Sequence, residues 1–322
     1  MEHQESVEYQ INTEKSRESS KNENGNGKTG NGKTSKNIML INDFPGYGKV
    51  ALAAMVPILS RMGHYTFQLP TAIVSNTLDY GKFRIEEMTD YMRDTLEVWK
   101  KLGFEPDCIC TGFVVSEEQA ELIAEYIRGL SREGKKPPLV MVDPIMADGG
   151  KLYNGIGPER VLAMRKLVGC SDVMVPNMTE ASFLTGIRPG KEAGTEKELR
   201  ELTDGLRKLS GRSVVITSAV ELEDTKACGQ ESEPCRTHLV YGYDHIEQEY
   251  FQVPYEYLPV RVAGSGDIFS AVMTGELLKE KPLKAAVAKA VKVLSRLIGE
   301  NEGHLQGYKG IVVERYWELL ED

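Results

Sequence analysis

The stretch Ala263-Gly264-Ser265-Gly266-Asp267-Ile268-Phe269-Ser270-Ala271 decides how the rest of the chain is interpreted. An extended segment, 257–262, leads into its two glycines, and an apolar segment of helical period follows to about Leu278. Glycine lets backbone N–H groups converge without an obstructing Cβ, and the first turn of a helix adds partial positive charge. The stretch therefore predicts a turn that binds an anion, such as a phosphoryl group in transfer.

Asp267 stands at the mouth of this anion turn. A carboxylate there can take a proton from an attacking hydroxyl group, and the sequence predicts no other carboxylate next to the turn. A glycine-rich turn with an aspartate near a helix N-terminus is also common in α/β proteins that bind no phosphate. The rest of the chain has to decide between these two interpretations.

The bulk properties exclude several classes of protein. The chain has 322 residues and a net charge of −9 at pH 7, so nucleic acid is not an expected partner. No apolar run approaches the roughly 20 residues that span a bilayer, and the N-terminus does not read as a signal peptide. The five cysteines include no C-x-x-C pair, so we expect reduced thiols, a cytoplasmic location and no zinc or redox site.

Residues 1–36 are polar and repetitive, and such a composition buries too little apolar surface to offset the cost of ordering. We expect a disordered tail, followed by one folded domain over residues 37–322. Within the tail, 27–34 satisfies the P-loop pattern G-x-x-x-x-G-K-[ST]. A working P-loop follows a strand and opens a helix, whereas here a polar segment precedes the match and an apolar strand comes after it. We therefore do not interpret it as a nucleotide site.

From residue 37 onward, apolar strands alternate with amphipathic helices. We expect strands at 37–42, 65–74, 108–113, 139–142, 171–175 and 213–218, and a hairpin at 237–241 and 247–253. We expect helices at 49–62, 84–102, 116–131, 158–168, 176–184, 196–209, 265–279, 283–299 and near 313–320, with an exposed loop at 221–235. This alternation predicts an α/β fold with a mostly parallel central sheet flanked by helices on both faces.

Polar residues follow the predicted strand ends, where parallel sheets bind ligands. They are Asp43, Ser75, Gly112, Asp143, Asn177, Ser218 and Asp267. Asp143 and Glu180 can hold Mg²⁺ directly or through waters, Thr217 and Ser218 offer hydroxyl groups to phosphates, and the turn 148–153 can border a nucleotide. Asn177 and Glu180 also match an ordinary helix-capping pattern, and Ser218 can simply end a strand.

Taken together and in this order, four segments resemble the ribokinase-like superfamily: Asp143-Pro144-Ile145-Met146, Pro176-Asn177-Met178-Thr179-Glu180, Val215-Ile216-Thr217-Ser218 and Gly264-Ser265-Gly266-Asp267. Within that superfamily the chain is most similar to the pyridoxal/pyridoxamine kinases. The segments that carry this second likeness are Val74-Ser75-Asn76-Thr77, Tyr80-Gly81, Thr111-Gly112-Phe113 and the glycine-rich loop after the first strand. The likeness covers about residues 37–300.

The resemblance implies ATP-dependent phosphorylation of the 5′-hydroxymethyl group of a vitamin B6 vitamer. It implies Mg²⁺ as a cofactor, in some members a monovalent cation such as K⁺, and usually a homodimer. Asp267 would be the catalytic base, and Gly264, Ser265 and Gly266 would form the anion hole. The other implied roles are ATP binding by Asp148, Tyr153, Asn177, Thr217 and Ser218, metal binding by Asp143 and Glu180, and a pyridine pocket of Asp43, Val74, Leu78 and Phe113.

The chain departs from the family pattern mainly on the substrate side. Asp43 stands where well-known members carry a serine, Thr77-Leu78 replaces a more usual His-Thr, and Phe113 replaces a tyrosine. Ala147-Asp148-Gly149 is a variant of the common Gly-Asp. The vitamer therefore stays open. An ionised Asp43 would favour pyridoxamine, whose ammonium group can pair with it, unless Asp43 caps its own loop.

Three other functions are weighed against this one. Hydroxymethylpyrimidine kinases of thiamine synthesis share the superfamily, but they usually carry a cysteine where this chain has Asp267. Sugar and nucleoside kinases carry a glycine-rich amino-terminal sugar motif that this chain lacks. A nucleotide-binding regulator without catalytic activity would not need Asp267 and Glu180. The sequence favours the B6 kinase.

Overall fold

The computed structural model describes residues 35–130, 136–153, 156–187, 193–223, 235–301 and 309–321. All of these except Ser35 belong to one unit, Lys36–Asp322. The expected tail and its P-loop-like match therefore lie outside the described residues, apart from Ser35 and Lys36. Lys36 already belongs to the folded unit, because the amide of Tyr65 donates to its carbonyl oxygen at 2.9 Å.

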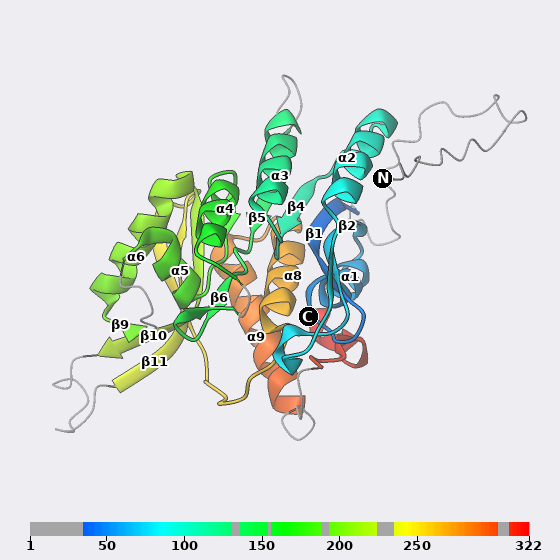
Figure 1. Cartoon of the computed structure of the whole chain (residues 1–322). Helices are drawn as coiled ribbons and strands as arrows, with labels where there is room; N and C mark the ends of the chain where they lie inside the picture. The colour runs from blue at the N-terminus through cyan, green and yellow to red at the C-terminus, as the bar shows by residue number, and fades with distance from the viewer. Residues whose placement is uncertain are drawn as a thin grey trace, which may run out of the picture. The chain divides into compact units, whose positions relative to one another are not determined.

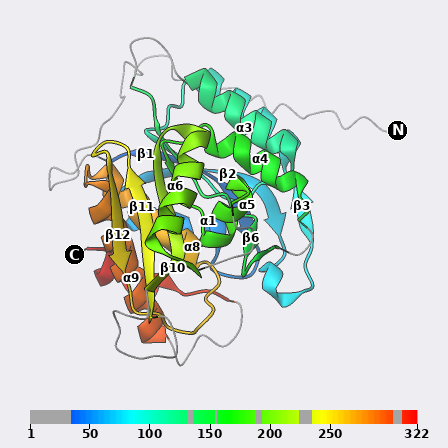
Figure 2. The same cartoon turned by 90° about the vertical axis from the view of Figure 1, so that its left-hand side faces the viewer.

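One sheet runs through this unit in the order β12-β11-β10-β8-β5-β4-β1-β2-β3, with β9 beside β10 (Figure 1, Figure 2). The central pairs from β10 to β2 are parallel, whereas β2–β3, β10–β11 and β11–β12 are antiparallel. The prediction of a mostly parallel sheet is confirmed. The strands are β1 Asn37–Pro45, β2 Tyr65–Val74, β3 Ile85–Glu87, β4 Cys108–Thr111, β5 Leu139–Val142, β8 Val173–Met174, β9 Ala193–Gly194, β10 Ser213–Glu223, β11 Cys235–Asp244 and β12 Glu249–Pro254.

Helices cover both faces of the sheet, as the sequence predicted. Successive side chains of β1 point to opposite faces, so Ile38 and Leu40 join one buried cluster and Met39 and Ile41 the other. The helices that pack in the first cluster are α1 Ala51–Arg61, α8 Ser265–Leu278 and α9 Leu283–Asn301. Those in the second are α2 Thr89–Leu102, α3 Glu117–Leu130, α4 Glu159–Val168, α5 Met178–Thr185 and α6 Glu196–Ser210. No helix among the described residues is long and apolar enough to cross a membrane.

Three predicted elements are wrong. The helix expected from residue 84 starts only at Thr89, because Ile85–Glu87 pairs with β2 as strand β3. Residues 257–262 form no strand, so the anion turn follows an irregular segment. The expected last helix is two 3₁₀ turns, η3 Val313–Arg315 and η4 Trp317–Leu320. Long-range pairing and packing override the local periodicity on which these predictions rested.

Three loops border or contain short secondary-structure elements. A loop is expected at 221–235, but β10 continues to Glu223, and residues 224–234 lie outside the described residues. The polar turn at 148–153 is a short hairpin of β6 Ala147–Asp148 and β7 Lys151–Leu152. A single 3₁₀ turn, η1 Leu78–Tyr80, lies in the loop between β2 and β3. The hairpin and the 3₁₀ turn both contribute to the site.

Candidate active site

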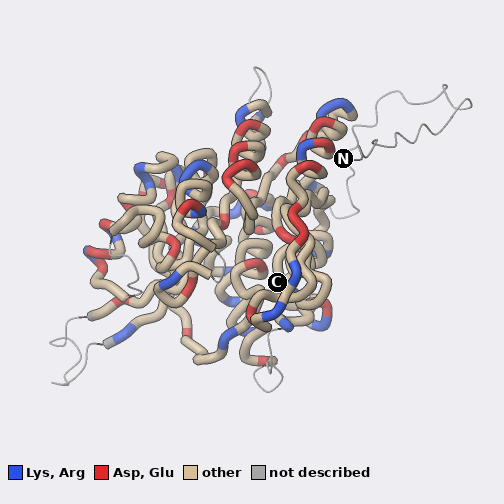
Figure 3. The backbone as a smooth tube through the Cα atoms, viewed as in Figure 1, with Lys and Arg blue, Asp and Glu red and all other residues tan. Residues whose placement is uncertain are grey.

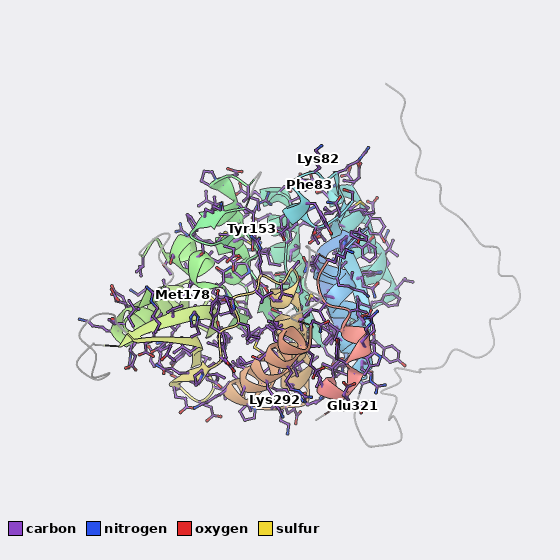
Figure 4. All side chains as sticks on the ribbon, turned by 90° about the horizontal axis from the view of Figure 1, so that it is seen from below. Lys82, Phe83, Tyr153, Met178, Lys292 and Glu321 are labelled. Carbon is purple, nitrogen blue, oxygen red and sulfur yellow. The ribbon has the colours of Figure 1, made fainter. Side chains whose placement is uncertain are left out.

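A cleft of about 800 Å³ opens at the carboxyl ends of the central parallel strands. All the residues to which the sequence assigned a specific role line it: Asp43, Val74, Leu78, Phe113, Asp143, Asp148, Tyr153, Asn177, Glu180, Thr217, Ser218, Gly264, Ser265, Gly266 and Asp267. Tyr153 and Met178, which both line the cleft, are labelled in Figure 4. The fold therefore brings these residues to one cleft.

The route by which some of them reach the cleft differs from the prediction. Asp43 lies within β1 rather than after it, and Ser218 lies within β10, at a break in the ladder where its φ is 56°. Asp267 follows no strand and is instead the third residue of α8. Ser75 is not among the described residues that line the cleft, and Gly112 lines a small adjoining cavity that Asp143 and Asp267 also line.

Asp267 is only 9% exposed and is held from two directions. Asn42 Nδ2 donates to its Oδ1 at 3.2 Å, and the backbone N–H of Ala51 donates to its Oδ2 at 2.8 Å. Ala51 is the first residue of α1, which has no side-chain cap of its own. Asp267 therefore caps α1 across a sequence separation of 216 residues, and the positive ends of α1 and α8 both face this carboxylate.

Three carboxylates share this part of the cleft, so the prediction that no other carboxylate lies next to the turn is wrong. A Cβ built on Gly266 would be 3.9 Å from Asp143 Oδ2. Burial raises the pKa of Asp267 to about 6, although the donors on Ala51 and Asn42 lower it. Burial and the nearby Asp267 charge raise the pKa values of Asp43 and Asp143 to about 7. The two donors on Asp267 favour its ionised form, which a general base needs.

The two glycines of the anion turn are required for different reasons. Gly264 has a φ of 80°, and a Cβ there would lie 2.4 Å from the carbonyl oxygen of Lys49, so the fold itself excludes a side chain. A Cβ on Gly266 would meet open space apart from Asp143. The amides of Gly266 and Asp267 donate to no acceptor among the described residues. They point to a bound anion as their partner.

Asn177 and Glu180 form the helix cap that their spacing in the sequence predicted. Asn177 Oδ1 accepts from the amide of Glu180, and Glu180 Oε2 accepts from the amide of Asn177, both at 2.9 Å. Glu180 Oε1 also accepts from the amide of Met146 at 3.0 Å. Burial and the Asp143 charge raise the pKa of Glu180, and its backbone donors lower it. The cap holds Glu180 at the cleft, so its structural role leaves it in place for the metal-binding role that the resemblance implies.

These donors fit a magnesium ion held largely by water and phosphate. Within the described residues, no three His, Cys, Asp or Glu side chains gather closely enough to hold a metal ion by themselves. Asp143 Oδ2 accepts from Ser270 Oγ at 3.0 Å, while no described residue donates to Oδ1. Mg²⁺ usually keeps several waters and takes one or two carboxylates plus phosphates. Asp143, and Glu180 through water, would hold such an ion.

The β6–β7 hairpin and the first turn of α5 form one wall of the cleft. Gly149 and Gly150 have φ values of 59° and 76°, the pair of positive angles that a tight two-residue hairpin needs. The amide of Gly150 donates to Thr179 Oγ1 at 3.0 Å, which ties the hairpin to α5. Thr217 lies beside this wall, because its amide donates to the carbonyl oxygen of Pro176 at 2.9 Å.

On the opposite side, the predicted pyridine pocket is built from strand ends and a loop. Asn42 Oδ1 accepts from the amide of Phe113 at 2.8 Å, and Thr71 Oγ1 donates to the carbonyl oxygen of Phe113 at 2.8 Å. These bonds fix the backbone of Phe113. Asp43 has no cation paired with it among the described residues, and no other described residue donates to its carboxylate. Among the described residues, no other residue of the loop therefore donates to Asp43 in the way that a loop cap requires.

Sequence reasoning missed several residues in the cleft or next to it. Asn42 contacts both Asp267 and Phe113, and its position at the end of the first apolar run was the one available signal. His238 and Tyr257 stack with ring centroids 4.2 Å apart and both line the cleft. Arg261 lines it too and pairs with Asp79. These last residues belong to an irregular segment and an antiparallel strand, where no motif marks them.

The profile of the phosphomethylpyrimidine kinase family matches residues 54–312. The chain belongs to this family. Several proteins related to this chain are named as vitamin B6 kinases. The pyridoxal kinase PdxY of Corynebacterium diphtheriae is 25% identical over 267 residues, 81% of this chain and 88% of that protein. The pyridoxine kinase of Bacillus subtilis is 27% identical over 265 residues, 79% of this chain and 87% of that protein. The resemblance drawn from the motifs is confirmed.

Solved structures show the same fold. A Bacteroides thetaiotaomicron protein assigned to the phosphomethylpyrimidine kinases superposes with a TM-score of 0.80 and 31% identity, over 90% of this chain and 95% of that one. A second crystal form of it, with pyridoxal, gives a TM-score of 0.78 and 32% identity, over 89% and 96% of the two chains. The pyridoxal kinase of Leishmania donovani with ADP and pyridoxamine shares the fold, with a TM-score of 0.73 and 24% identity over 89% and 96%.

Proposed function

We propose that this protein is an ATP-dependent kinase that phosphorylates the 5′-hydroxymethyl group of a vitamin B6 vitamer. The observation that carries the proposal is the carboxylate of Asp267. It lies at the N-terminus of α8, accepts hydrogen bonds from Ala51 and Asn42, and has a pKa of about 6. A base with that pKa is ionised at neutral pH and can still accept a proton from a hydroxyl group.

The geometry supports a direct transfer of the terminal phosphoryl group. Asp267 takes the proton of the acceptor hydroxyl as its oxygen attacks phosphorus, and the bond from phosphorus to the leaving oxygen of ADP breaks. The free amides of Gly266 and Asp267 stabilise the charge on the phosphoryl oxygens. Asp143, and Glu180 through water, would hold Mg²⁺, which would neutralise further phosphate charge. Asp148, Tyr153, Asn177, Thr217 and Ser218 border the nucleotide in this proposal.

The choice of acceptor rests on the relatives and on Asp267. The curated relatives reported above are pyridoxal and pyridoxine kinases, and the Bacteroides thetaiotaomicron structure contains pyridoxal. The family name itself supports a second candidate, phosphorylation of a hydroxymethylpyrimidine. An aspartate at the anion turn favours the first, because the resemblance associates the second with a cysteine there. Val74, Leu78 and Phe113 would contact the pyridine ring, with Asp43 at its edge.

The proposal also includes a homodimer in the cytoplasm. Large apolar side chains are exposed around the end of β1 and the β2–β3 loop: Phe44, Tyr47, Ile73, Tyr80 and Phe83 are each 39–50% exposed. Apolar residues gathered in this way support a protein interface. Cys108, Cys110 and Cys170 are free thiols, which is consistent with a reducing compartment. Dependence on K⁺ is part of the proposal only through the family resemblance.

The test is release of ADP from Mg²⁺ and ATP with four acceptors: pyridoxal, pyridoxine, pyridoxamine and hydroxymethylpyrimidine. We expect the highest kcat/KM with a B6 vitamer, and we expect omission of K⁺ in the same assay to report any cation dependence. Turnover of the pyrimidine alone would favour the second candidate. Binding of ATP without turnover of any acceptor would instead identify a nucleotide-binding regulator.

A further inference from the structure

The lining of the cleft is unusually one-sided in charge. Over the folded unit, acidic and basic residues are interspersed along the helices (Figure 3). In the cleft, by contrast, seven carboxylates are found: Asp43, Asp79, Asp143, Asp148, Glu180, Glu256 and Asp267. Arg261 is the one Lys or Arg among the described residues that line it. A site for a polyanionic nucleotide therefore has a single side chain with a permanent positive charge.

Other candidate cations near the anion turn are already engaged. Lys49 contacts Gly264 through its carbonyl oxygen, but its ammonium group pairs with Glu314 and does not line the cleft. His238 lines the cleft, and burial together with the Arg236 charge lowers its pKa, so its imidazole is mostly neutral at pH 7. No charge on these residues substitutes for Arg261.

Arg261 is held in a way that is easily exchanged. Its Nη2 donates to Asp79 Oδ1 at 2.7 Å, and the two side chains are 61% and 24% exposed. Exposed ion pairs contribute little, whereas a guanidinium bound to phosphate in two places makes strong charge-assisted bonds. Arg261 is three residues before Gly264, and both residues line the same cleft. The guanidinium is thus within reach of the volume beside the anion turn.

We infer that Arg261 binds the phosphate chain of the nucleotide beside the anion turn, and that Asp79 holds its guanidinium only while the cleft is empty. The phosphate displaces the Asp79 carboxylate. Asp79 belongs to η1, next to Leu78 of the predicted pyridine pocket, so the same exchange frees the loop on the acceptor side. The inference rests on the proposed function, because it assumes a nucleoside triphosphate in this cleft.

Calorimetry on the full chain without an acceptor tests this inference. It measures binding of the Mg²⁺ complex of AMP-PNP and, separately, binding of adenosine. Arg261→Gln weakens binding of AMP-PNP by about 10- to 100-fold, which corresponds to about 1.4–2.8 kcal/mol, and leaves binding of adenosine within about twofold. Arg261→Lys restores part of the loss, because it keeps the charge but not the two-point contact. Asp79→Asn leaves binding of AMP-PNP unchanged or up to about threefold tighter.

A matched control removes a similar ion pair elsewhere. Arg128 pairs with Glu121 at 2.8 Å on α3 and is 59% exposed, and Arg128→Gln leaves both affinities unchanged. The inference is overturned if Arg261→Gln binds AMP-PNP as tightly as the wild type, or if it loses adenosine equally. It is also overturned if Asp79→Asn weakens AMP-PNP as much as Arg261→Gln, since the pair would then be structural. If the wild type binds neither ligand, the proposed function itself fails.

Discussion

The two sides of the cleft are built by different means. The side proposed to bind phosphate consists largely of backbone: the first turn of α8, the capped first turn of α5 and the hairpin tied to Thr179. The acceptor side consists of side chains at strand ends and on η1, such as Val74, Leu78 and Phe113. Backbone hydrogen bonds fix the first side. The second depends on side chains, of which Val74 and Phe113 are buried and Leu78 is partly exposed.

This difference shows why the reaction is easier to infer than the acceptor. Backbone amides at helix ends bind phosphate through their geometry, whatever side chains surround them. Because few sequences satisfy this geometry, those that do are recognisable. Side chains on strand ends and loops can change without disturbing the fold, and each change alters which acceptor fits. Asp43 and Phe113 are such positions in this chain. The comparison predicts that mutations on the two sides differ in kind and in size.

The largest effect is expected from Asp267→Asn. Loss of a general base typically lowers kcat by about 10²- to 10⁴-fold, while nucleotide binding survives because the amides of the turn remain. Asparagine still accepts from Ala51 through its carbonyl oxygen, so the fold is kept. Steady-state kinetics and calorimetry with AMP-PNP measure the two quantities separately. In the wild type, kcat/KM falls about tenfold per pH unit below about pH 6, the pKa of Asp267.

Asp143→Asn is the matched comparison, because Asp143 is the other carboxylate that faces the turn. We expect it to weaken the response to Mg²⁺ and to keep the acid limb of the pH profile. If Asp267→Asn stays within threefold of the wild-type kcat, or if Asp143→Asn abolishes the acid limb, Asp143 is the better candidate for the base.

The next effect comes from placing the same methyl group on two neighbouring glycines. Gly266→Ala leaves thermal stability unchanged, because its Cβ meets open space, and lowers kcat/KM at least about tenfold, because the methyl group occupies the phosphate volume. Gly264→Ala instead lowers stability by roughly 1–3 kcal/mol, because its φ is 80° and Lys49 is too close. Melting curves and kinetics on both variants check this. Equal losses of stability would show that the turn is not a preformed phosphate site.

On the acceptor side, Asp43→Ser is expected to change which vitamer is preferred rather than the rate of the reaction itself. An ionised Asp43 can pair with the ammonium group of pyridoxamine, whereas pyridoxal has a neutral aldehyde there. A charge-assisted hydrogen bond is worth about 1.5–3 kcal/mol, so the ratio of kcat/KM for pyridoxamine to that for pyridoxal falls about tenfold or more. Because the pKa of Asp43 is raised to about 7, the preference is stronger at pH 8 than at pH 6. A ratio that does not move in the mutant would assign the preference to another residue.

The smallest effect concerns the stability of the empty protein. Asp43, Asp143 and Asp267 have raised pKa values, so between about pH 4 and pH 7 the folded state binds more protons than the unfolded state. Their contribution to stability is therefore lost as the pH rises through these pKa values. Asp43→Asn removes one of the three charges. We expect the melting temperature of the mutant minus that of the wild type to become a few degrees more positive from pH 5 to pH 8. Scanning calorimetry without ligand measures this difference.

The sequence sufficed for those parts of the site that depend on local backbone chemistry. The glycines at 264 and 266, the cap formed by Asn177 and Glu180, and Asp267 were all marked by residue type and spacing. It failed where a long-range contact decides. Ile85–Glu87 is helical by periodicity but pairs with β2, and the approach of Asp143 to the turn follows from the order of strands in the sheet. Arg261 carries no motif at all, and its charge becomes notable only once the lining of the cleft is known.

The bonds that hold Asp267 also determine when the protein becomes active during its synthesis. Asn42 and Ala51 are made early, while Asp267 emerges 225 and 216 residues later. Gly310, nearer still to the end of the chain, packs against Lys49 and the carbonyl oxygen of Ala263. Such long-range contacts form slowly, and a growing chain folds from its N-terminus. A nascent chain can therefore complete most of its sheet before Asp267 is present, and the candidate catalytic centre is assembled only after residues 263–310 have been made.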